Sequence, residues 1–549
     1  MKPGIRLGMF AHPGTIAIPL GGPIFGMHSA CRSGAQAILR HSEAESVHFV
    51  CSPQATPYTR REIEIATAER TKGPRCSLEP LLDFTGRKDG EPLTAWLDLG
   101  GDTTRPFAFR RRIGANYPIA VVHHSVSYGY VLHNWFLPLL LGDVRPQDTL
   151  VCTSPSALRV MARTLDQMAR DLGEQHGIPS LAYKGRLDVV PLGVDCDRFR
   201  PREKAAAREK IPWIGKDEIA LLWVGRISAH DKADLIPLLR VFRKLVEVHP
   251  GKKLRLVIAG SPRTGSDELS VLAKEAVRLE IRDKVSEISP CQNELLPDLY
   301  AASDIFVSPA DSVQEMFGLT VVEAMASGLS VVCSDWGGYR DSVVHGETGF
   351  LVRTYGSLGD EDAVDLGEWS LLGGELLDQL VLAQSVAVCP RGLFQALSTL
   401  VEKPDLRREM GRAGRLRAER KFAWPKVVSE YDALFRELSA MDLGKPLPGH
   451  PYSRPRFDEV FAEYPSRVFA DALLEPSDGE RGKKPRDPRP ETGTIDGGTL
   501  AAVSEMVERR GRASLLEIET AFAPAPAHRI RRHVLWLMKY GHIQVEENA

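Results

Sequence analysis

The stretch that decides the fold is SPADSVQEMFGLTVVEAMASGLSVVCSDWGGYRDSVVHGETGFLV, at residues 308–352. Its pattern predicts a buried strand that ends at Ser308, a loop that carries Glu315, and a helix that opens near Gly318 and carries Glu323. The first amides of such a helix have no carbonyl partners and lie at the positive end of the helix dipole. We therefore expect this helix start to be a seat for a phosphate group.

The two glutamates fit a ligand with hydroxyl groups on both sides of that phosphate. Glu315 precedes the helix and Glu323 lies about a turn and a half inside it, so each carboxylate can accept hydrogen bonds from one side. A nucleotide sugar has this order of groups: sugar, diphosphate, ribose. Two isolated glutamates at this spacing would usually be solvated surface residues, but the surrounding FGLTVVEAMASG favours the binding site.

On both sides of this stretch, short apolar runs alternate with helical segments, which is typical of parallel α/β domains. In the first half the expected strands are 5–11, 47–52, 119–122, 149–152 and 187–190, with helices at 27–40 and 156–172. In the second half the expected strands are 219–224, 254–259, 305–308 and 330–334, with helices at 235–248, 266–280 and 320–326.

The same rhythm sets the domain boundaries. We expect one Rossmann-like domain at 1–195, a second at 196–405 with an insertion at about 355–385, helices at 406–440, a Pro-rich linker at 441–495, and a small module at 496–549. Three helix-sized segments and a terminal strand make that module winged-helix-like.

With these motifs the chain resembles glycosyltransferase family 4, whose two-domain architecture is called GT-B and has two Rossmann-like domains facing a cleft. The element from Glu315 to Glu323 matches the family's E-x7-E signature. WVGRISAHDK at 223–232 resembles its phosphate-binding strand end, VVPLGVDCDRFRP at 189–201 resembles its interdomain hinge, and Gly21-Gly22 resembles its N-terminal glycine loop. The resemblance covers about residues 1–440. It implies that the domain at 1–195 is the acceptor domain, that the domain at 196–405 is the nucleotide-sugar domain, and that 406–440 are the closing helices.

The resemblance implies roles for particular residues. Arg226 and Lys232 would hold the donor diphosphate, which suits a planar guanidinium and a movable ammonium. Glu315 would bind sugar hydroxyls and Glu323 ribose hydroxyls. The further expected donor-binding residues are Gly21, Gly22, Phe317, Gly318, Leu319 and Thr320.

Two histidines follow the strand at 119–122, at the edge where α/β sheets place ligands. The family usually has a histidine at this strand end, near the reacting carbon. Aligning by the strand end favours His123 as the catalytic residue; His124 takes that place if the strand is one residue longer, and a histidine bonded to a backbone carbonyl is the structural alternative. Weaker candidates are His12, Gly337 and Gly338.

The family also implies the reaction. We expect a retaining, metal-independent glycosyltransferase that needs no cofactor, with a nucleotide-diphosphate sugar as co-substrate and the leaving phosphate as acceptor of the proton. Asp195-Cys196-Asp197 spells a D-x-D metal motif but lies in the hinge, so we do not assign it a metal. The alternatives are a sugar-nucleotide epimerase, a disaccharide synthase or phosphorylase, or a non-catalytic regulatory or scaffold protein that acts through the C-terminal module.

The amino-acid composition excludes few classes of binding partner. The 549 residues carry 70 basic and 72 acidic side chains, a formal charge of −2, which disfavours a protein that coats a polyanion. The 8 cysteines form no C-x-x-C pair, which fits a reducing cytoplasm. No secretory signal or membrane-length apolar run is evident, so we expect a cytoplasmic protein that is at most peripheral to membranes.

The terminal module is balanced in charge as well. Its basic helix-like segment HRIRRHVLWLMKYG allows nucleic-acid binding, but the nearly neutral module makes a protein partner or self-association the favoured interpretation, with a simple packing role as the remaining one. The acceptor of the sugar, whether glycan, lipid, peptide or small molecule, stays open.

Overall fold

The computed structural model describes residues 4–11, 26–52, 55–68, 73–81, 84, 87–88, 91–263, 265–357, 359, 361, 364–366, 376–445, 457–464, 472–480, 482–488 and 494–546. His12 and the Gly21-Gly22 loop lie outside these residues. The chain divides into two compact units. One holds residues 1–50, 58–79 and 85–451, and the other holds 452–549 together with 51–57 and 80–84; each is described by itself.

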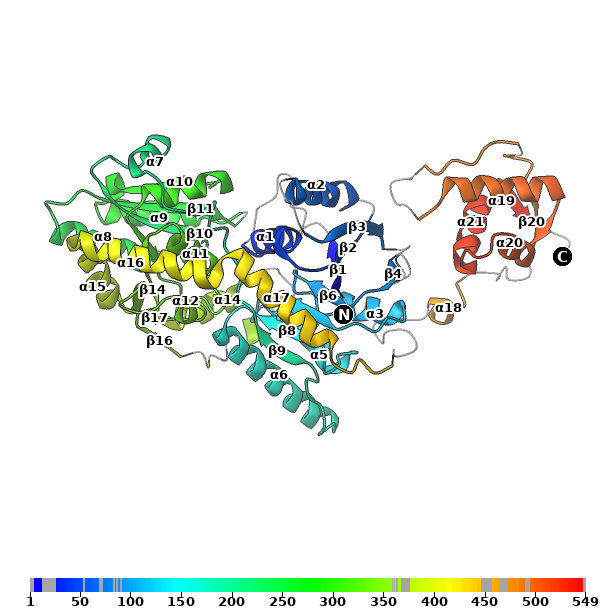
Figure 1. The fold of residues 1–549 in the computed structure, drawn as a ribbon, viewed down its shortest axis with the longest axis horizontal. Coiled ribbons are helices and arrows are strands. Elements are labelled where there is room, and N and C mark those ends of the chain that lie inside the picture. Colours follow the sequence, from blue (N-terminus) through cyan, green and yellow to red (C-terminus); the bar gives the residue numbers. More distant parts are fainter. Residues whose placement is uncertain are drawn as a thin grey trace. The chain divides into compact units, whose positions relative to one another are not determined.

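The N-terminal domain of the larger unit is built on a seven-stranded sheet with the order β3-β2-β1-β6-β7-β8-β9. The pairings from β1 to β6 and onward through β7, β8 and β9 are parallel. Helices flank this sheet (Figure 1). The elements are β1 (Arg6–Ala11), α1 (Gly26–His41), β2 (Ser46–Cys51), α2 (Thr56–Thr67), β3 (Arg75–Pro80), β4 (Arg87–Lys88), β5 (Glu91–Pro92), β6 (Ala95–Asp98), α3 (Arg105–Arg112), β7 (Ile119–Val122), α4 (Gly129–Val131), a π-helical turn (Leu132–Phe136), α5 (Leu137–Leu141), β8 (Thr149–Cys152), α6 (Pro155–His176) and β9 (Arg186–Val189).

The second domain has a six-stranded parallel sheet with the order β12-β11-β10-β13-β14-β15. Its elements are α7 (Lys204–Lys210), β10 (Ile219–Ile227), α8 (Ile236–Val248), β11 (Leu254–Pro262), α9 (Glu268–Arg278), β12 (Val285–Ile288), α10 (Leu296–Ala302), β13 (Ile305–Ser308), α11 (Leu319–Ala326), β14 (Ser330–Ser334), α12 (Tyr339–Ser342), β15 (Gly349–Val352), β16 (Thr354–Gly356), α14 (Leu377–Gln384), β17 (Val386–Val388) and α15 (Pro390–Glu402), with 3-10 turns at Arg282–Lys284 and Asn293–Leu295.

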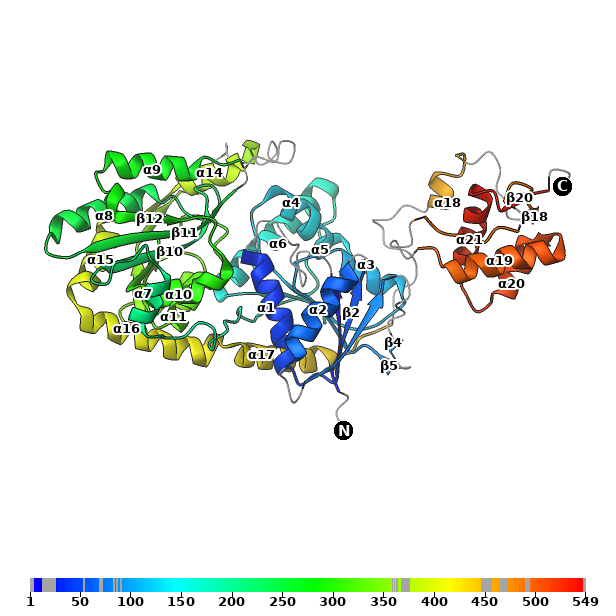
Figure 2. The same ribbon diagram turned by 90° about the horizontal axis from the view of Figure 1, so that it is seen from above.

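Burial explains why the central strands read as continuous apolar runs. In β10 the side chains of Leu221, Leu222 and Trp223 are all 0% exposed, because helices cover both faces of the parallel sheet. Figure 2 shows α8 and α9 on one side of this sheet and α10 and α11 on the other. Such a sheet leaves only the strand ends and the loops beyond them for function.

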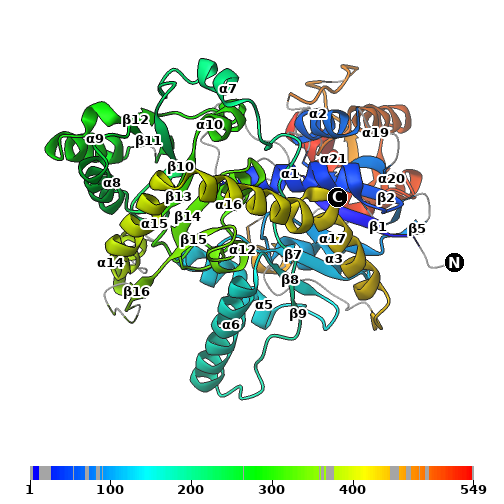
Figure 3. The ribbon, with the colours of Figure 1, turned by 60° about the vertical axis from the view of Figure 1, so that its left-hand side comes forward.

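After α15 the chain passes through α16 (Pro404–Arg417) and a π-helical turn (Ala418–Phe422) to α17 (Trp424–Ser439), which packs along α1 of the N-terminal domain (Figure 3). Val194 in the hinge pairs with Ala423 just before α17. Gly193 lies so close to the Trp424 ring that a Cβ there would come within 2.2 Å of it. The two chain crossings between the domains are therefore packed against each other.

The smaller unit contains α18 (Phe457–Val460), β18 (Leu473–Pro476), α19 (Gly497–Arg510), β19 (Ala513–Ser514), α20 (Leu515–Ala521), α21 (Ala527–Lys539) and β20 (Ile543–Val545). The strands form an antiparallel sheet with the order β19-β18-β20. Its core includes Leu500, Ile518 and Leu537, each 0% exposed.

The two Rossmann-like domains expected from the sequence are confirmed, and one expected boundary needs correction. We expected residues 441–495 to be a linker, but β18 lies inside that span and forms the centre of the terminal sheet. The strand supplies its own apolar side chain to the module, since Leu474 is 0% exposed. Among the described residues, no helix is both long and apolar enough to cross a membrane.

Candidate functional site

The two cations and the first glutamate expected to bind a donor lie at the carboxyl edge of the second sheet. Arg226 lies near the end of β10, Lys232 lies in the loop after it, and Glu315 lies in the loop after the neighbouring strand β13. The Lys232 Nζ atom is 2.5 Å from Glu315 Oε2. The parallel pairing of β10 with β13 therefore joins residues that are 83 positions apart in the sequence.

Gly318 forms the start of α11 as the sequence predicted. Its φ angle is +88°, a left-handed conformation that favours glycine, and its carbonyl accepts the first helical bond from the Val321 amide. Leu319 and Thr320 follow as the first helical residues. The Thr320 hydroxyl is buried and has no hydrogen-bond partner among the described residues, so it is a polar group that a phosphate oxygen could satisfy.

Glu323 lies on α11 beside Tyr300 of α10. The Tyr300 hydroxyl donates to Glu323 Oε2 over 2.9 Å. Burial raises the pKa of Glu323 to about 7, although the bond from Tyr300 and the charges of Arg198 and Lys232 act in the opposite direction. The charge of this side chain therefore depends on pH near neutrality.

A cluster that the sequence analysis missed surrounds Asp231. Arg226 forms an ion pair with Asp231 Oδ2 at 2.9 Å, Arg263 at the end of β11 forms a second, and Tyr128 donates its hydroxyl to the same oxygen over 2.9 Å. Burial alone would raise the pKa of Asp231, but the two arginines outweigh it and hold the pKa below its ordinary value. The sequence signal was the Asp directly before Lys232 and an Arg directly after a buried strand.

The loop of the N-terminal domain that carries Tyr128 makes a second set of contacts, with Gln314 next to Glu315. The Val126 amide donates to Gln314 Oε1 over 3.1 Å, and Gln314 Nε2 donates to Ser127 Oγ over 2.6 Å. Gln379 of α14 joins them, because its Oε1 accepts from the Ser127 hydroxyl over 2.9 Å. Part of the predicted insertion is therefore hydrogen-bonded to the loops that carry Ser127 and Gln314.

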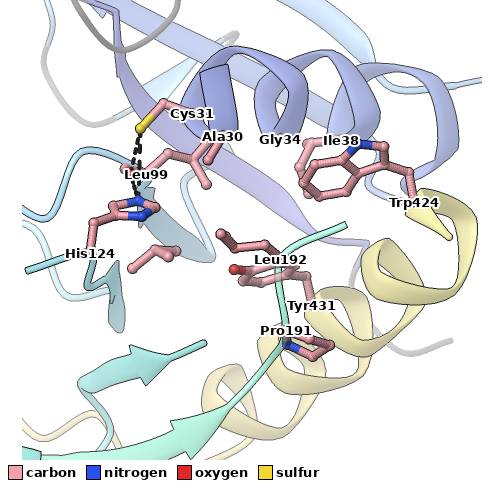
Figure 4. Close-up of a pocket in the computed structure, with 11 residues that line it drawn as sticks. Ala30, Cys31, Gly34, Ile38, Leu99, His124, Pro191, Leu192, Trp424 and Tyr431 are labelled. Atoms are coloured by element: carbon pink, nitrogen blue, oxygen red, sulfur yellow. Dashed lines mark hydrogen bonds between the residues drawn. The ribbon is translucent and has the colours of Figure 1, made fainter. Parts of the chain in front are cut away.

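The two histidines have different surroundings. His124 Nε2 lies 2.7 Å from the Leu99 carbonyl oxygen and 3.8 Å from Cys31 Sγ, and it lines an apolar pocket formed by α1, the hinge and α17 (Figure 4). His123 is 0% exposed, and neither of its ring nitrogens has a partner among the described residues. Its ring packs near Phe136 at 5.0 Å, and burial lowers its pKa to about 3, so the ring is neutral at physiological pH.

The glycine loop after β14 packs directly on the loop that carries Glu315. A Cβ at Gly337 would lie 2.1 Å from the Glu315 carbonyl oxygen, and one at Gly338 would lie 2.1 Å from the Met316 carbonyl oxygen. The Gly338 amide also donates to the Glu315 carbonyl over 3.1 Å. The loop with these two glycines therefore packs against the backbone of the Glu315 loop, and only residues without a Cβ fit there.

One expected donor residue is placed differently. The Phe317 side chain is 5% exposed and packs in the core at 5.8 Å from the Phe422 ring, so only its backbone is available to a ligand. The hinge motif is a turn, since Asp195 Oδ1 accepts backbone bonds from Asp197 and Arg198. The remaining described candidates lie on the loops and helix at the edge of the second sheet, apart from the two histidines, which follow β7 of the first.

Part of this chain is similar in sequence to known glycosyltransferases. Residues 204–366 match the family described as glycosyl transferases group 1. D-inositol 3-phosphate glycosyltransferase 2 of Catenulispora acidiphila is 40% identical over 267 residues, which cover 47% of this chain and 57% of that protein. D-inositol 3-phosphate glycosyltransferase of Nocardia farcinica is 36% identical over 207 residues, which cover 38% of this chain and 44% of that protein. The chain thus matches about half the length of these curated relatives.

Among solved structures, Anabaena HepE in complex with UDP is similar in fold. The two align with a TM-score of 0.52 at 12% identity, over 80% of this chain and 100% of that one. The likeness spans both α/β domains and concerns their fold alone.

Proposed function

We propose that the protein transfers a sugar from a nucleotide-diphosphate donor to an acceptor hydroxyl, because residues 204–366 match the family described as glycosyl transferases group 1. The observation that carries the proposal is the contact of Lys232 with Glu315 at 2.5 Å, beside the start of α11. A cation and a carboxylate beside a helix start are the groups that a diphosphate joined to a sugar requires, and this supports the proposal.

The chemistry of the residues supports a substitution driven by stabilisation of the leaving group. Arg226 and Lys232 supply positive charge to the departing diphosphate, and the α11 amides supply a positive helix end. These groups need no metal ion to neutralise the diphosphate. In the retaining course that we propose, the bond from the anomeric carbon to the phosphate oxygen breaks, the acceptor oxygen bonds to the same face, and the leaving phosphate takes the acceptor proton.

A thermal-shift screen against UDP-, GDP-, ADP- and dTDP-glucose in the presence of EDTA tests donor binding. A donor at 100 times its Kd stabilises the folded state by about 2.7 kcal/mol. We expect one nucleotide to raise the melting temperature, and we expect Lys232→Ala to remove most of that shift. A flat response to all four donors would contradict the proposal.

Product analysis then separates transfer from its alternatives. The curated relatives are named for D-inositol 3-phosphate, so this compound is the first acceptor to test with a labelled donor. We expect a glycosylated acceptor with the anomeric configuration of the donor, as judged by NMR coupling constants. An epimerised nucleotide sugar without an adduct would instead identify an epimerase, and an inverted product would refute the retaining course.

A further inference from the structure

Each of the two glutamates in the E-x7-E motif is hydrogen-bonded to a tyrosine that is 0% exposed. Glu315 accepts from Tyr339 of α12, and Glu323 accepts from Tyr300 of α10. The two tyrosines come from different loops and helices of the second domain, and neither was a candidate from the sequence. Because they contact the groups at the two ends of the proposed donor, any role for them in binding rests on the proposed function.

The Tyr339 hydroxyl has two hydrogen-bond partners, which fix the position of the side chain. Its Oη lies 2.7 Å from Ser308 Oγ at the end of β13 and 3.2 Å from Glu315 Oε2. Its ring fills the space beside Gly318, where a Cβ would come within 2.2 Å of Tyr339 Cε1. One side chain therefore packs against the α11 cap and also holds the carboxylate in the loop before it.

The contacts of Glu315 leave one of its oxygens available. Tyr339 and Lys232 both bind Oε2, and Oε1 has no hydrogen-bond partner among the described residues. A carboxylate that is held at one oxygen keeps the other in a fixed direction, where it can accept from a sugar hydroxyl. The same division holds at Glu323, where Tyr300 bonds Oε2.

Tyr300 also connects its glutamate to the helix start. Its hydroxyl lies 3.3 Å from the Thr320 carbonyl oxygen as well as 2.9 Å from Glu323 Oε2. Burial raises the pKa of both tyrosines well above the ordinary range, so both hydroxyls stay protonated and act as donors. Water does not compete with the hydrogen bonds of these two hydroxyls, because both tyrosine rings are enclosed by the core of the domain.

We propose that Tyr339 and Tyr300 are the positioning residues of the donor site, with Tyr339 orienting Glu315 toward the sugar and Tyr300 orienting Glu323 toward the ribose. Preorganised acceptors of this kind strengthen binding because their rotamers are fixed before the ligand arrives. The two tyrosines should therefore act on different ends of the ligand. The Tyr339 hydroxyl affects the binding affinity only when a sugar is attached, whereas the Tyr300 hydroxyl affects the affinity for every nucleotide.

Three matched substitutions of buried tyrosines test this separation: Tyr339→Phe, Tyr300→Phe and Tyr117→Phe. The last is the control, because Tyr117 is 1% exposed in the N-terminal domain and its hydroxyl has no hydrogen-bond partner among the described residues. Each full-length variant is titrated with two probes: the diphosphate among UDP, GDP, ADP and dTDP that binds the wild type most tightly, and its glucose conjugate.

We expect Tyr339→Phe to weaken the glucose conjugate by about three- to tenfold, the effect of one hydrogen bond, with the bare diphosphate unchanged. We expect Tyr300→Phe to weaken both probes by the same factor and Tyr117→Phe to weaken neither. Ser308→Ala keeps the Tyr339 ring and removes one hydrogen-bond partner of its hydroxyl. We therefore expect it to weaken the glucose conjugate by less than Tyr339→Phe does, with the bare diphosphate unchanged.

Other patterns overturn the inference. If Tyr339→Phe and Ser308→Ala weaken both probes equally, Tyr339 supports the fold of the site rather than the sugar end. If Tyr300→Phe affects only the conjugate, the assignment of the two ends is wrong. A wild-type protein that binds none of the four diphosphates refutes the proposed function itself, which distinguishes that failure from a failure of this inference.

Discussion

Glu323 shows how the surroundings of one residue control a binding site. Its carboxyl is shielded by α10 and α11, and this burial raises its pKa to about 7 in spite of Tyr300, Arg198 and Lys232, which favour the charged form. Since the folded-state pKa lies above the ordinary value, the proton on Glu323 favours the folded state, and this contribution is lost as the pH rises through about 7. The binding of ribose hydroxyls has the opposite preference, because it needs the charged acceptor.

Donor affinity should therefore fall as the pH is lowered below about 7, by up to about tenfold per pH unit. The measurement is the Kd of the glucose conjugate between about pH 5.5 and about pH 8, where the ester-linked diphosphate itself takes up no proton. Tyr300→Phe removes a bond that lowers the pKa, so it should move the midpoint upward.

Glu323→Gln is the control for this pH profile, since an amide does not titrate in the range. His123 does not explain such a profile because its pKa is lowered to about 3. Should the profile persist in Glu323→Gln, Glu323 is not the titrating group; Asp311 and Asp98 are the next residues to substitute, because burial raises the pKa of each to about 7.

For single residues, sequence reasoning found the groups that form a contiguous motif and missed those assembled by folding. Glu315 and Glu323 are recognisable from their fixed spacing in one motif, and Lys232 from a nearby pattern. Tyr339, Tyr300 and Arg263 have no such spacing, because they reach the site from α12, from α10 and from the end of β11. Only the three-dimensional order of β10, β11, β13 and β14 brings them together.

The element that supports the site most closely is the loop after β14. Gly337 has a φ angle of +46°, and a Cβ at this position would lie 2.1 Å from the Glu315 carbonyl oxygen. Gly337→Ala should push the Glu315 loop out of place, reduce donor affinity at least tenfold, and lower the melting temperature. Isothermal titration and a thermal melt of the same preparation measure both effects.

Gly346→Ala is the matched control for that substitution. Gly346 also has a left-handed φ, +80°, but nothing lies within 4 Å of the position of its Cβ. The control should lose about 1 kcal/mol of stability through the backbone alone and bind donor normally. Equal donor affinity in Gly337→Ala and Gly346→Ala would show that the contact between the loops does not position Glu315.

The predicted strands of the two large sheets lie within three residues of their observed bounds, because a parallel sheet covered on both faces favours continuous apolar runs. β3, β6, β12 and β15 of these sheets were missed: their sequences are RCSLEP, AWLD, VSEI and GFLV, so none of them has a long apolar run. β18 was missed because its residues lie in a Pro-rich, charged stretch, where composition outweighs four residues of pattern. Its pairing with β19 and β20 is non-local and has no signature in its own sequence.

For the larger unit as a whole, Gln379 tests how its two domains cooperate. Its side chain is 1% exposed and is hydrogen-bonded to Ser127 of the N-terminal domain and, through Oε1, to Gln314 beside Glu315. Gln379→Ala should weaken the contact between the domains, admit water to the donor, and raise the ratio of donor hydrolysis to transfer. Gln395→Ala, on the exposed face of α15, should leave the ratio unchanged; if the two variants agree, the Gln379 network has no part in excluding water.

The division of the chain into two units predicts that each has its own stability. Leu537 of α21 is 0% exposed in the core of the smaller unit, and all the proposed donor residues lie in the larger one. In the full-length protein Leu537→Ala should cost the smaller unit about 2–5 kcal/mol, because a large buried side chain leaves a cavity. Calorimetry should then show an early transition for this unit and an unchanged donor-dependent shift in the main transition. If the substitution instead abolishes the donor response, the two units are not independent, and donor binding requires a folded smaller unit.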